Sequence, residues 1–378
     1  MKTLFTNMAV MAILLVHGCD KNIPVSIEPL EQGKKLTDLS GIIECTRLVQ
    51  LESVPGNGLV YPDKVLLLRD GSFVLKDKRC NVNVQKYSRD GRYVCGFGSG
   101  GRVQDICIGE DQSVCILGLG NITRYDSRNG SFLDSLAIPR HNYDEFCRDG
   151  HGGYWIFAAA PDFDHYDFDT PFPTLYHFPA GESEPTEELL PRKDYIMNIS
   201  MITQAADGSS LLRPLEGENV LYSLNGKVRP LASFDFKERA IPGRYMVHDG
   251  FPDYGRYMPS PYFKFILHVH NTARDFYFAA AGPGGDLYNF IFTKKWSSGI
   301  YWKDLRDTDT PSVVRASDEE GYYVMVYDAG GLVNLPPEKL SPLNRIIVGK
   351  ILDEGITLNG NPLIAKISVR QGLKQSTP

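Results

Sequence analysis

A single motif repeats along the chain: a short apolar run, a turn containing Asp, Glu or Gly, and a second apolar run. Because such turn residues favour tight chain reversals, each copy predicts a β-hairpin. The six copies read KVLLLRDGSFVLKD, DICIGEDQSVCILG, DEFCRDGHGGYWIFAAA, SMITQAADGSSLLRP, FILHVHNTARDFYFAAAG and VVRASDEEGYYVMVYDAG. Their spacing of roughly 40 to 65 residues is typical of propellers and solenoids.

A second hairpin unit follows some of these copies, as KYSRDGRYV, RYDSRNGSFL and LYSLNGKVRPL. Two hairpins together make a four-stranded antiparallel blade, the unit of a β-propeller. The innermost strands, such as VLLL and FILHV, are apolar on both faces, as expected of strands between neighbouring blades. The pattern therefore predicts an all-β, six-bladed β-propeller. A β-sandwich with irregular loops is the alternative.

The end of the chain indicates how the ring closes. SPLNRIIVGKILDEG predicts one short helix, with Ser341 as its N-cap, Pro342 at the first position and Gly355 just past the end. The strand NPLIAKISV follows, so the last blade has only three strands of its own. We expect residues 44–52, ECTRLVQLE, to supply the fourth strand and remove an exposed edge.

The N-terminus has the features of a secretory signal. Lys2 precedes an apolar stretch over residues 8–16, which is too short to span a bilayer. The LVHGC ending resembles a lipobox, so we expect residues 1–18 to be removed and Cys19 to be the lipid attachment site. An ordinary signal peptide is the alternative. The expected domains are the signal peptide, an anchor and linker over residues 19–40, and a propeller over residues 41–378.

Charge and hydropathy limit the partners. Lys and Arg total 40 against 46 Asp and Glu, and no basic run interrupts the mixture. This balance argues against a nucleic-acid partner, which needs a concentrated basic face. No second long apolar stretch follows the signal, so the acyl chains would be the membrane attachment. We expect a lipid-anchored protein of a bacterial cell envelope, at the outer membrane.

The cysteines are scattered, and a chain of 378 residues has no need of disulfide staples. We expect most of the six that remain beside Cys19 to be buried, unpaired thiols. Cys107 and Cys115 flank a turn symmetrically, which would place them opposite each other in a hairpin. A cross-strand disulfide between them is the alternative, although it demands narrow geometry.

The order of these segments resembles a known family. ECTRLVQLE, KVLLLRDGSFVLKD, KYSRDGRYVCGFGSGGR, RYDSRNGSFL and a closing helix before NPLIAKISV look like the six-bladed β-propeller lipoproteins of Gram-negative gut bacteria. In that family the glycine-rich stretch reads closer to G-x-G-P-G-E, whereas this chain has GSGGR without the proline or glutamate. The resemblance implies a fold and a location, and it leaves the function open.

Linear catalytic motifs are missing from the sequence. GFGSGG, over residues 96–101, has the spacing G-x-G-x-x-G, but a strand pattern follows it rather than a helix, which indicates an inter-blade turn. No G-x-S-x-G, H-E-x-x-H or C-x-x-C motif appears. His268 and His270 lie two apart on a strand and share a face. We expect them to be buried and hydrogen-bonded rather than metal ligands.

Two loops carry the candidate ligand-binding residues. Residues 161–172 are acidic and aromatic, and their oxygens suit a hard cation such as calcium, although the spacing is not that of an EF-hand and a solvated acidic loop is the alternative. Residues 244–263 combine aromatic rings with Arg, Asp and His, as sugar or peptide sites do; a loop packed over the rim is the alternative. The candidates are Asp162, Asp164, His165, Tyr166, Tyr245, His248, Asp249, Tyr254, Arg256 and Tyr257.

Strand counting places both loops on one face, opposite tight turns that we expect to be too small to build a pocket. The leading hypothesis is a membrane-anchored, non-enzymatic binding or scaffold module that holds a glycan, peptide or protein on this face, without a cofactor. The alternative is a lactonase-like or glycan lyase-like propeller enzyme with an axial metal or acid/base site. Three or more carboxylates or histidines converging on the axis would favour the enzyme, and an apolar or merely polar channel would favour the binder.

Overall fold

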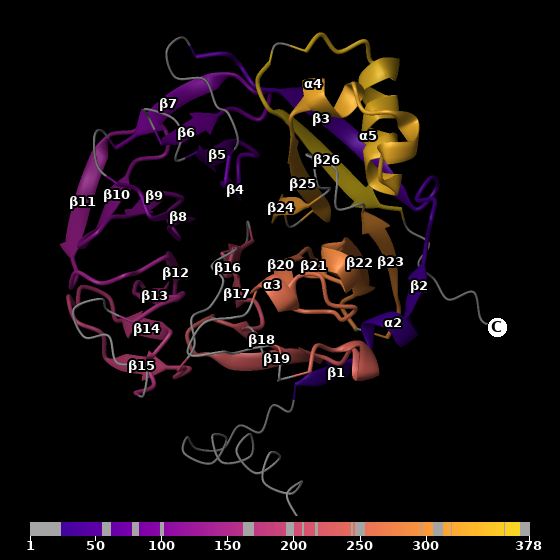
Figure 1. Ribbon diagram of the computed structural model, residues 1–378. Helices are drawn as coiled ribbons and strands as arrows, with labels where there is room; N and C mark the ends of the chain where they lie inside the picture. Colours follow the sequence, from indigo (N-terminus) through magenta and orange to yellow (C-terminus); the bar gives the residue numbers. More distant parts are fainter. Residues whose placement is uncertain are drawn as a thin grey trace, which may run out of the picture.

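The computed structural model describes residues 24–54, 62–77, 83–98, 102–161, 170–193, 200–205, 208–215, 218–242, 245, 254–295, 297–304, 313–318, 320–358 and 360–370. Six separate sheets account for the strands. Their innermost strands contact one another in a closed circle, so the sheets are the blades of a six-bladed propeller (Figure 1). The predicted fold class is confirmed, and the sandwich alternative is wrong because the sheets do not stack as two layers.

The first three blades follow the chain in order. Blade 1 consists of β4 (Lys64–Leu67), β5 (Phe73–Lys76), β6 (Val84–Tyr87) and β7 (Tyr93–Phe97). Blade 2 consists of β8 (Asp105–Ile108), β9 (Val114–Leu117), β10 (Asn121–Tyr125) and β11 (Phe132–Ala137). Blade 3 consists of β12 (Glu145–Arg148), β13 (Tyr154–Phe157), β14 (Leu175–Phe178) and β15 (Glu187–Leu189).

The remaining blades complete the ring. Blade 4 contains β16 (Ile202–Gln204), β17 (Ser210–Leu212), β18 (Val220–Ser223) and β19 (Arg229–Phe234). Blade 5 contains β20 (Ile266–Asn271), β21 (Asp275–Ala281), β22 (Leu287–Thr293) and β23 (Gly299–Asp304). Blade 6 contains β24 (Val314–Ser317), β25 (Tyr322–Tyr327), β26 (Leu363–Val369) and β3 (Ile43–Gln50).

Blade 6 closes the ring as expected. Strand β3 pairs antiparallel with β26, and Leu48 lies opposite Ala365. Helix α5 (Pro342–Asp353) lies between β25 and β26 in the chain, and the Ser341 hydroxyl accepts a hydrogen bond from the Asn344 N–H at 3.1 Å. Just past the helix, Gly355 has a φ of 60°, a conformation that a residue without Cβ adopts freely. The short helix α4 (Ala329–Val333) precedes α5.

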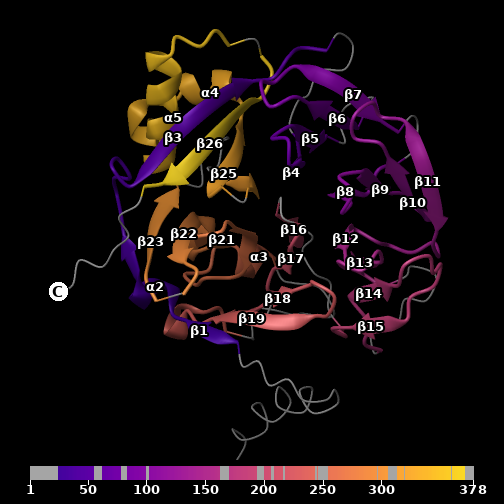
Figure 2. The same cartoon turned by 180° about the vertical axis from the view of Figure 1, so that it is seen from behind.

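Two short strands precede β3 and were not foreseen. Strand β1 (Val25–Ile27) pairs parallel with β19, and β2 (Gly33–Lys35) pairs parallel with β23. A short helix, α2 (Pro29–Gln32), connects them. The figures show this N-terminal segment running along the outside of blades 4 and 5 (Figures 1 and 2). Part of the stretch that we describe as anchor and linker therefore covers the outer edges of two blades.

The core lies between neighbouring blades. Val65, Leu66 and Leu67 of the innermost strand β4 are buried, as are four of the six residues of the innermost strand β20, as expected of strands between neighbouring blades. Trp155 and Trp302 are among the largest fully buried side chains. Each large apolar side chain buried in this way stabilises the fold by about 2 kcal/mol. The blades therefore form a packed ring that holds the connecting loops in place.

Candidate functional site

The strand order defines two faces of the ring. The innermost strand of each blade begins at the face that we call the loop face and ends at the turn face. The connections from β13 to β14 and from β19 to β20 both lead from one loop-face strand end to another, and Gly98, Arg102 and the glycine-rich residues 282–286 lie at the same face. The hairpin turns from first to second and from third to fourth strands lie at the turn face.

Most of the predicted loop residues fall outside the described part of the chain. These are Asp162, Asp164, His165, Tyr166, His248 and Asp249, together with the side chain of Tyr254. The acidic residues of the proposed calcium site over residues 161–172 all lie within the undescribed residues 162–169, so the site stays a prediction. In the described part, no group of three or more His, Cys, Asp or Glu side chains could hold a metal ion.

Three of the predicted residues are described, and they differ in exposure. The guanidinium carbon of Arg256 lies 5.9 Å from the centre of the Tyr245 ring, within reach of a cation–π contact. The Tyr245 ring in turn lies 5.8 Å from that of Tyr262. Tyr257, at the end of helix α3 (Tyr254–Tyr257), is fully buried and stacks on Phe265. The buried Tyr257 is therefore a core residue rather than a ligand contact, Tyr245 is half-buried against the same cluster, and Arg256 is exposed.

A hollow at the ring axis opens on the loop face, and we call it the axial funnel. Its volume is about 540 Å³. Every blade or the segment leading into it contributes to the lining. The lining residues are Asp63, Lys64, Lys76, Asn83, Arg102, Val103, Gln104, Asp105, Asp144, Glu145, Ser200, His268 and Arg315. Sequence reasoning missed all of these except His268, because they are brought together only when the ring closes.

Carboxylates of the axial funnel join neighbouring blades. Asp105, at the start of β8, lies 2.6 Å from the Lys64 ammonium and accepts a hydrogen bond from the Phe146 N–H at 3.0 Å. Glu145, at the start of β12, accepts hydrogen bonds from the Met201 and Ile202 N–H groups, both at 2.8 Å. Each acid therefore satisfies backbone donors of the next blade. An acidic residue at the first position of an inner strand was the available sequence signal.

The Lys64 ammonium at the base of the axial funnel keeps its charge although it is buried. Burial by itself would lower the pKa of Lys64, but the carboxylates of Asp105 and Glu145 outweigh it and raise that pKa above its ordinary value. Burial raises the pKa of Glu145, although the Lys64 ammonium opposes this. Lys64 therefore stays protonated at neutral pH. The result is a buried polar network whose members depend on one another.

His268 and His270 lie two residues apart on β20, and His268 lines the axial funnel. Both are buried, as expected, at 4% and 2% exposure, but their Nδ1 atoms have no hydrogen-bond partner in the described part of the chain. Burial lowers the pKa of both rings, and the nearby Arg315 lowers it further, to about 3 for His270. Both imidazoles are therefore neutral near pH 7. The Nδ1 atom of His268 is a buried polar group beside the funnel without a partner among the described residues.

A contact near the turn face links non-adjacent blades. The Gln204 side chain in blade 4 accepts a hydrogen bond from the Ile108 N–H in blade 2 and donates one to the Ile108 carbonyl, both at 2.8 Å. Gln204 and Ile108 are the last residues of their inner strands. The bond pair therefore ties two blades that flank blade 3 to each other.

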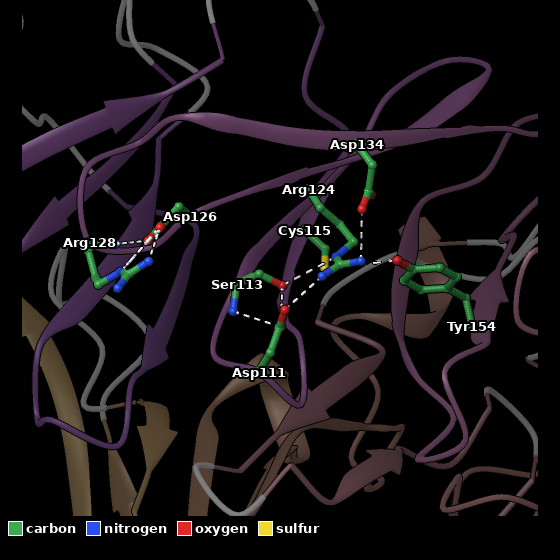
Figure 3. Close-up of polar contacts among 8 residues, drawn as sticks. All are labelled: Asp111, Ser113, Cys115, Arg124, Asp126, Arg128, Asp134 and Tyr154. Atoms are coloured by element: carbon green, nitrogen blue, oxygen red, sulfur yellow. Dashed lines mark hydrogen bonds and ion pairs between the residues drawn. The ribbon is translucent and has the colours of Figure 1, made fainter.

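The turn face also carries a hollow, of about 600 Å³, between blades 1 and 2. The expectation that its tight turns are too small to build a pocket is therefore wrong, because turns of adjacent blades flank the gap jointly. Its charged groups are held by neighbours: Asp111 by Arg124 at 2.7 Å and Asp126 by Arg128 (Figure 3). These pairs are largely exposed and local to blade 2, so the axial funnel is the better candidate site.

No family model matches the chain, and no curated protein does either. Among solved structures, hydrazine synthase from Kuenenia stuttgartiensis is 10% identical with a TM-score of 0.42, covering 85% of this chain and 89% of that one. Virginiamycin B lyase from Staphylococcus aureus is 10% identical with a TM-score of 0.41, covering 85% and 100%. A Bacteroides caccae protein of unknown function is 11% identical with a TM-score of 0.36, covering 65% and 87%. Identities of 10% and 11% carry no function over to this chain.

Proposed function

We propose that this propeller is a lipid-anchored binding module of the bacterial envelope that holds a polar ligand in its axial funnel. The observation that carries the proposal is the lining itself, to which all six blades contribute charged or polar side chains. Binding sites with a few convergent polar groups in one concave pocket are the usual arrangement for small or extended ligands. A closed ring holds such groups rigidly, which lowers the entropic cost of binding.

The lining favours a glycan or a peptide over a simple ion. It contains the cationic side chains of Lys76, Arg102 and Arg315 beside the carboxylates of Asp63 and Asp144. Lys76 lies 3.4 Å from Asp63, and Asp144 accepts a hydrogen bond from the Ala159 N–H at 2.7 Å. Donors and acceptors are thus present together, as a ligand rich in hydroxyl or amide groups requires.

A propeller enzyme is the second candidate, and His268 is the observation in its favour. The funnel gathers four acidic residues and one histidine, which meets the criterion of convergence at the axis. However, Asp105 is paired with Lys64 and Glu145 accepts backbone N–H groups, so both carboxylates are used in contacts between blades. The imidazole of His268, whose Nδ1 has no partner among the described residues, is placed to hydrogen-bond a bound substrate, although burial and Arg315 lower its pKa and make it a weak proton acceptor.

The test is ligand capture by variants of the funnel. The purified protein is screened against glycans and peptides derived from envelope and host material, and hits are measured by calorimetry. We expect Arg102→Ala and Asn83→Ala to weaken binding by about tenfold each, the usual loss of a ligand hydrogen bond. Arg128→Ala, whose side chain is 85% exposed on the turn face, is the matched control and should bind normally.

Two outcomes would change the assignment. Unaltered binding by both funnel variants, with loss in Arg128→Ala, would overturn the funnel as the binding site. If a captured glycan is instead converted to product, and His268→Asn abolishes conversion while retaining binding, the enzyme candidate replaces the binding module.

Lipid anchoring is proposed from the signal sequence, and Cys19 lies outside the described residues. Among the described residues, no helix combines the length and apolar character needed to cross a bilayer. We expect Cys19→Ser to move the protein from the membrane fraction to the soluble fraction, because two or more acyl chains are needed for firm attachment. A Cys19→Ser protein that stays with the membrane would show that the anchor is not lipid.

A further inference from the structure

The direction of β1 determines from which side the chain reaches the propeller. Strand β19 leaves a hairpin turn at the turn face and leads to the β19–β20 connection at the loop face. Strand β1 is parallel to β19, with Val25 opposite Ala232 and Ile27 opposite Phe234. The chain therefore enters β1 from the turn-face side of blade 4.

The chain between the anchor cysteine and β1 is short. Val25 is the sixth residue after Cys19 in the sequence, and a chain of this length spans at most about 20 Å. Ala232, the partner of Val25, is three residues beyond the start of β19, or about 10 Å from the turn-face rim. A membrane-bound Cys19 therefore holds the turn-face rim of blade 4 within about 10 Å of the bilayer. Reaching the loop face instead would require the chain to reverse beside the long β19–β20 connection.

Three exposed apolar side chains lie at the turn face, whereas Leu119 and Leu352, exposed as well, lie apart in two separate connections of the loop face. Val94 is 41% exposed, Phe132 62% and Leu133 43%. Val94 is the second residue of β7, and Phe132 and Leu133 begin β11, so all three lie where outer strands leave the turn face. They belong to neighbouring blades 1 and 2, on a different part of the ring from β1. The turn face thus has exposed apolar side chains at one part of its rim and a short tether at another. Both can reach a membrane together only if the whole face, rather than the outer edge of one blade, lies against it.

We propose that the turn face lies against the membrane that holds the anchor, so that the axial funnel opens away from it. This inference rests on the lipid anchoring proposed above. The partner of the turn face is a lipid bilayer surface, which the side chains of Phe132 and Leu133 contact at the level of the headgroups. A ligand in the surrounding compartment then reaches the funnel without passing between protein and membrane.

Fluorescence energy transfer to labelled lipid tests this orientation. The full-length lipoprotein is reconstituted into phosphatidylethanolamine and phosphatidylglycerol vesicles with an acceptor dye on the headgroups. A donor dye is attached through an azide-bearing amino acid at Glu184, in an exposed turn-face hairpin, or at Glu238, exposed on the loop face. Because the two faces are separated by about 20 Å of blade, we expect clearly stronger transfer from position 184 than from position 238. Equal transfer, or stronger transfer from position 238, would overturn the proposal.

Two further variants identify the cause. A flexible insertion of about 20 Gly and Ser residues between Cys19 and Pro24 lengthens the tether. It should reduce the difference in energy transfer between positions 184 and 238 without releasing the protein from the membrane. Phe132→Ser with Leu133→Ser should also reduce it, whereas Leu352→Ser, at a 64% exposed position on α5, should not. An unchanged difference in both test variants would contradict the tether and contact argument.

The experiments test the lipid anchoring and the orientation separately. If Cys19→Ser remains in the membrane fraction, the lipid anchoring is wrong and the orientation loses its basis. If Cys19→Ser is released but the wild-type protein shows equal transfer from both positions, the anchoring stands and only the orientation is wrong.

Discussion

The ammonium of Lys64, at the start of β4, lies 2.6 Å from the carboxylate of Asp105, at the start of β8, and both side chains are largely buried. The same carboxylate accepts the Phe146 N–H of β12. One ion pair therefore connects the inner strands of blades 1, 2 and 3 at the base of the axial funnel.

Removing one partner of this pair should destabilise the fold more than removing both. Lys64→Met leaves the Asp105 carboxylate buried without its cation, so we expect a loss of about 3 kcal/mol in the free energy of unfolding. Lys64→Met combined with Asp105→Asn removes both charges, while the amide oxygen introduced at position 105 still accepts the Phe146 N–H, and should lose less than Lys64→Met alone. Urea unfolding of the soluble domain measures both. Additive losses would show that the two groups are not coupled.

Acid should destabilise the protein through its buried histidines. His270 has a folded-state pKa of about 3 because burial and the charge of Arg315 disfavour its protonation, whereas the unfolded value is near 6.5. Only the unfolded state then takes up a proton between these values, so the stability due to His270 is present above pH 6.5 and is lost as pH falls toward 3. As the pH falls from 6.5 to 4, we expect this group to lower the free energy of unfolding by about 3 kcal/mol.

The control for the pH effect is His270→Asn, which cannot titrate in this range. The difference in unfolding free energy between wild type and variant should narrow as the pH falls from 6.5 to 4. A constant difference over that range would mean that His270 is not held neutral by the fold.

Ring closure should depend on the final strand. Strand β26 pairs with both β25 and β3, and Leu363, Ile364 and Ile367 are buried. Their burial alone stabilises the fold by about 6 kcal/mol, at about 2 kcal/mol each. We expect removal of residues 362–378 to abolish the cooperative thermal transition, and removal of residues 371–378 to leave it intact, because every described strand is retained. A protein without residues 362–378 that melts at the wild-type temperature would contradict the closure.

The cysteines should behave as separate thiols. Cys45, Cys95, Cys107, Cys115 and Cys147 are unpaired, and all except Cys95 are buried. Burial raises the pKa of Cys45 and of Cys147 to about 12, so neither forms a thiolate readily. In a variant lacking Cys19 and Cys80, we expect Ellman's reagent to reach only Cys95 before unfolding and five thiols after it. Detecting three thiols in unreduced, unfolded protein would reveal the Cys107–Cys115 disulfide.

Local patterns in the chain were sufficient for the blades. Asp-Gly and Asn-Gly turns between apolar runs specify hairpins without outside help, and the repeat of these hairpins predicted six blades. The Ser341 cap was likewise identified, because a helix cap depends on residues close together in the sequence. The segment around Leu48 was identified because the last blade lacked a fourth strand of its own. The sequence alone also indicated the loop face, since strand alternation determines on which side each connection emerges.

The site and the tether depended on tertiary structure. Asp105 and Glu145 stand out in the sequence only as acidic residues at the start of inner strands, and their partners, the N–H groups of the next blade, are set by the closed ring. The three-residue strands β1 and β2 carry no periodicity of their own and form only because blades 4 and 5 offer unpaired edges. The sequence thus determined the repeating unit through short-range turn chemistry and hydrophobic patterning. Closure of the ring decided the funnel, and the open outer edges of blades 4 and 5 decided the path of the N-terminal segment, because both require contacts between residues far apart in the chain.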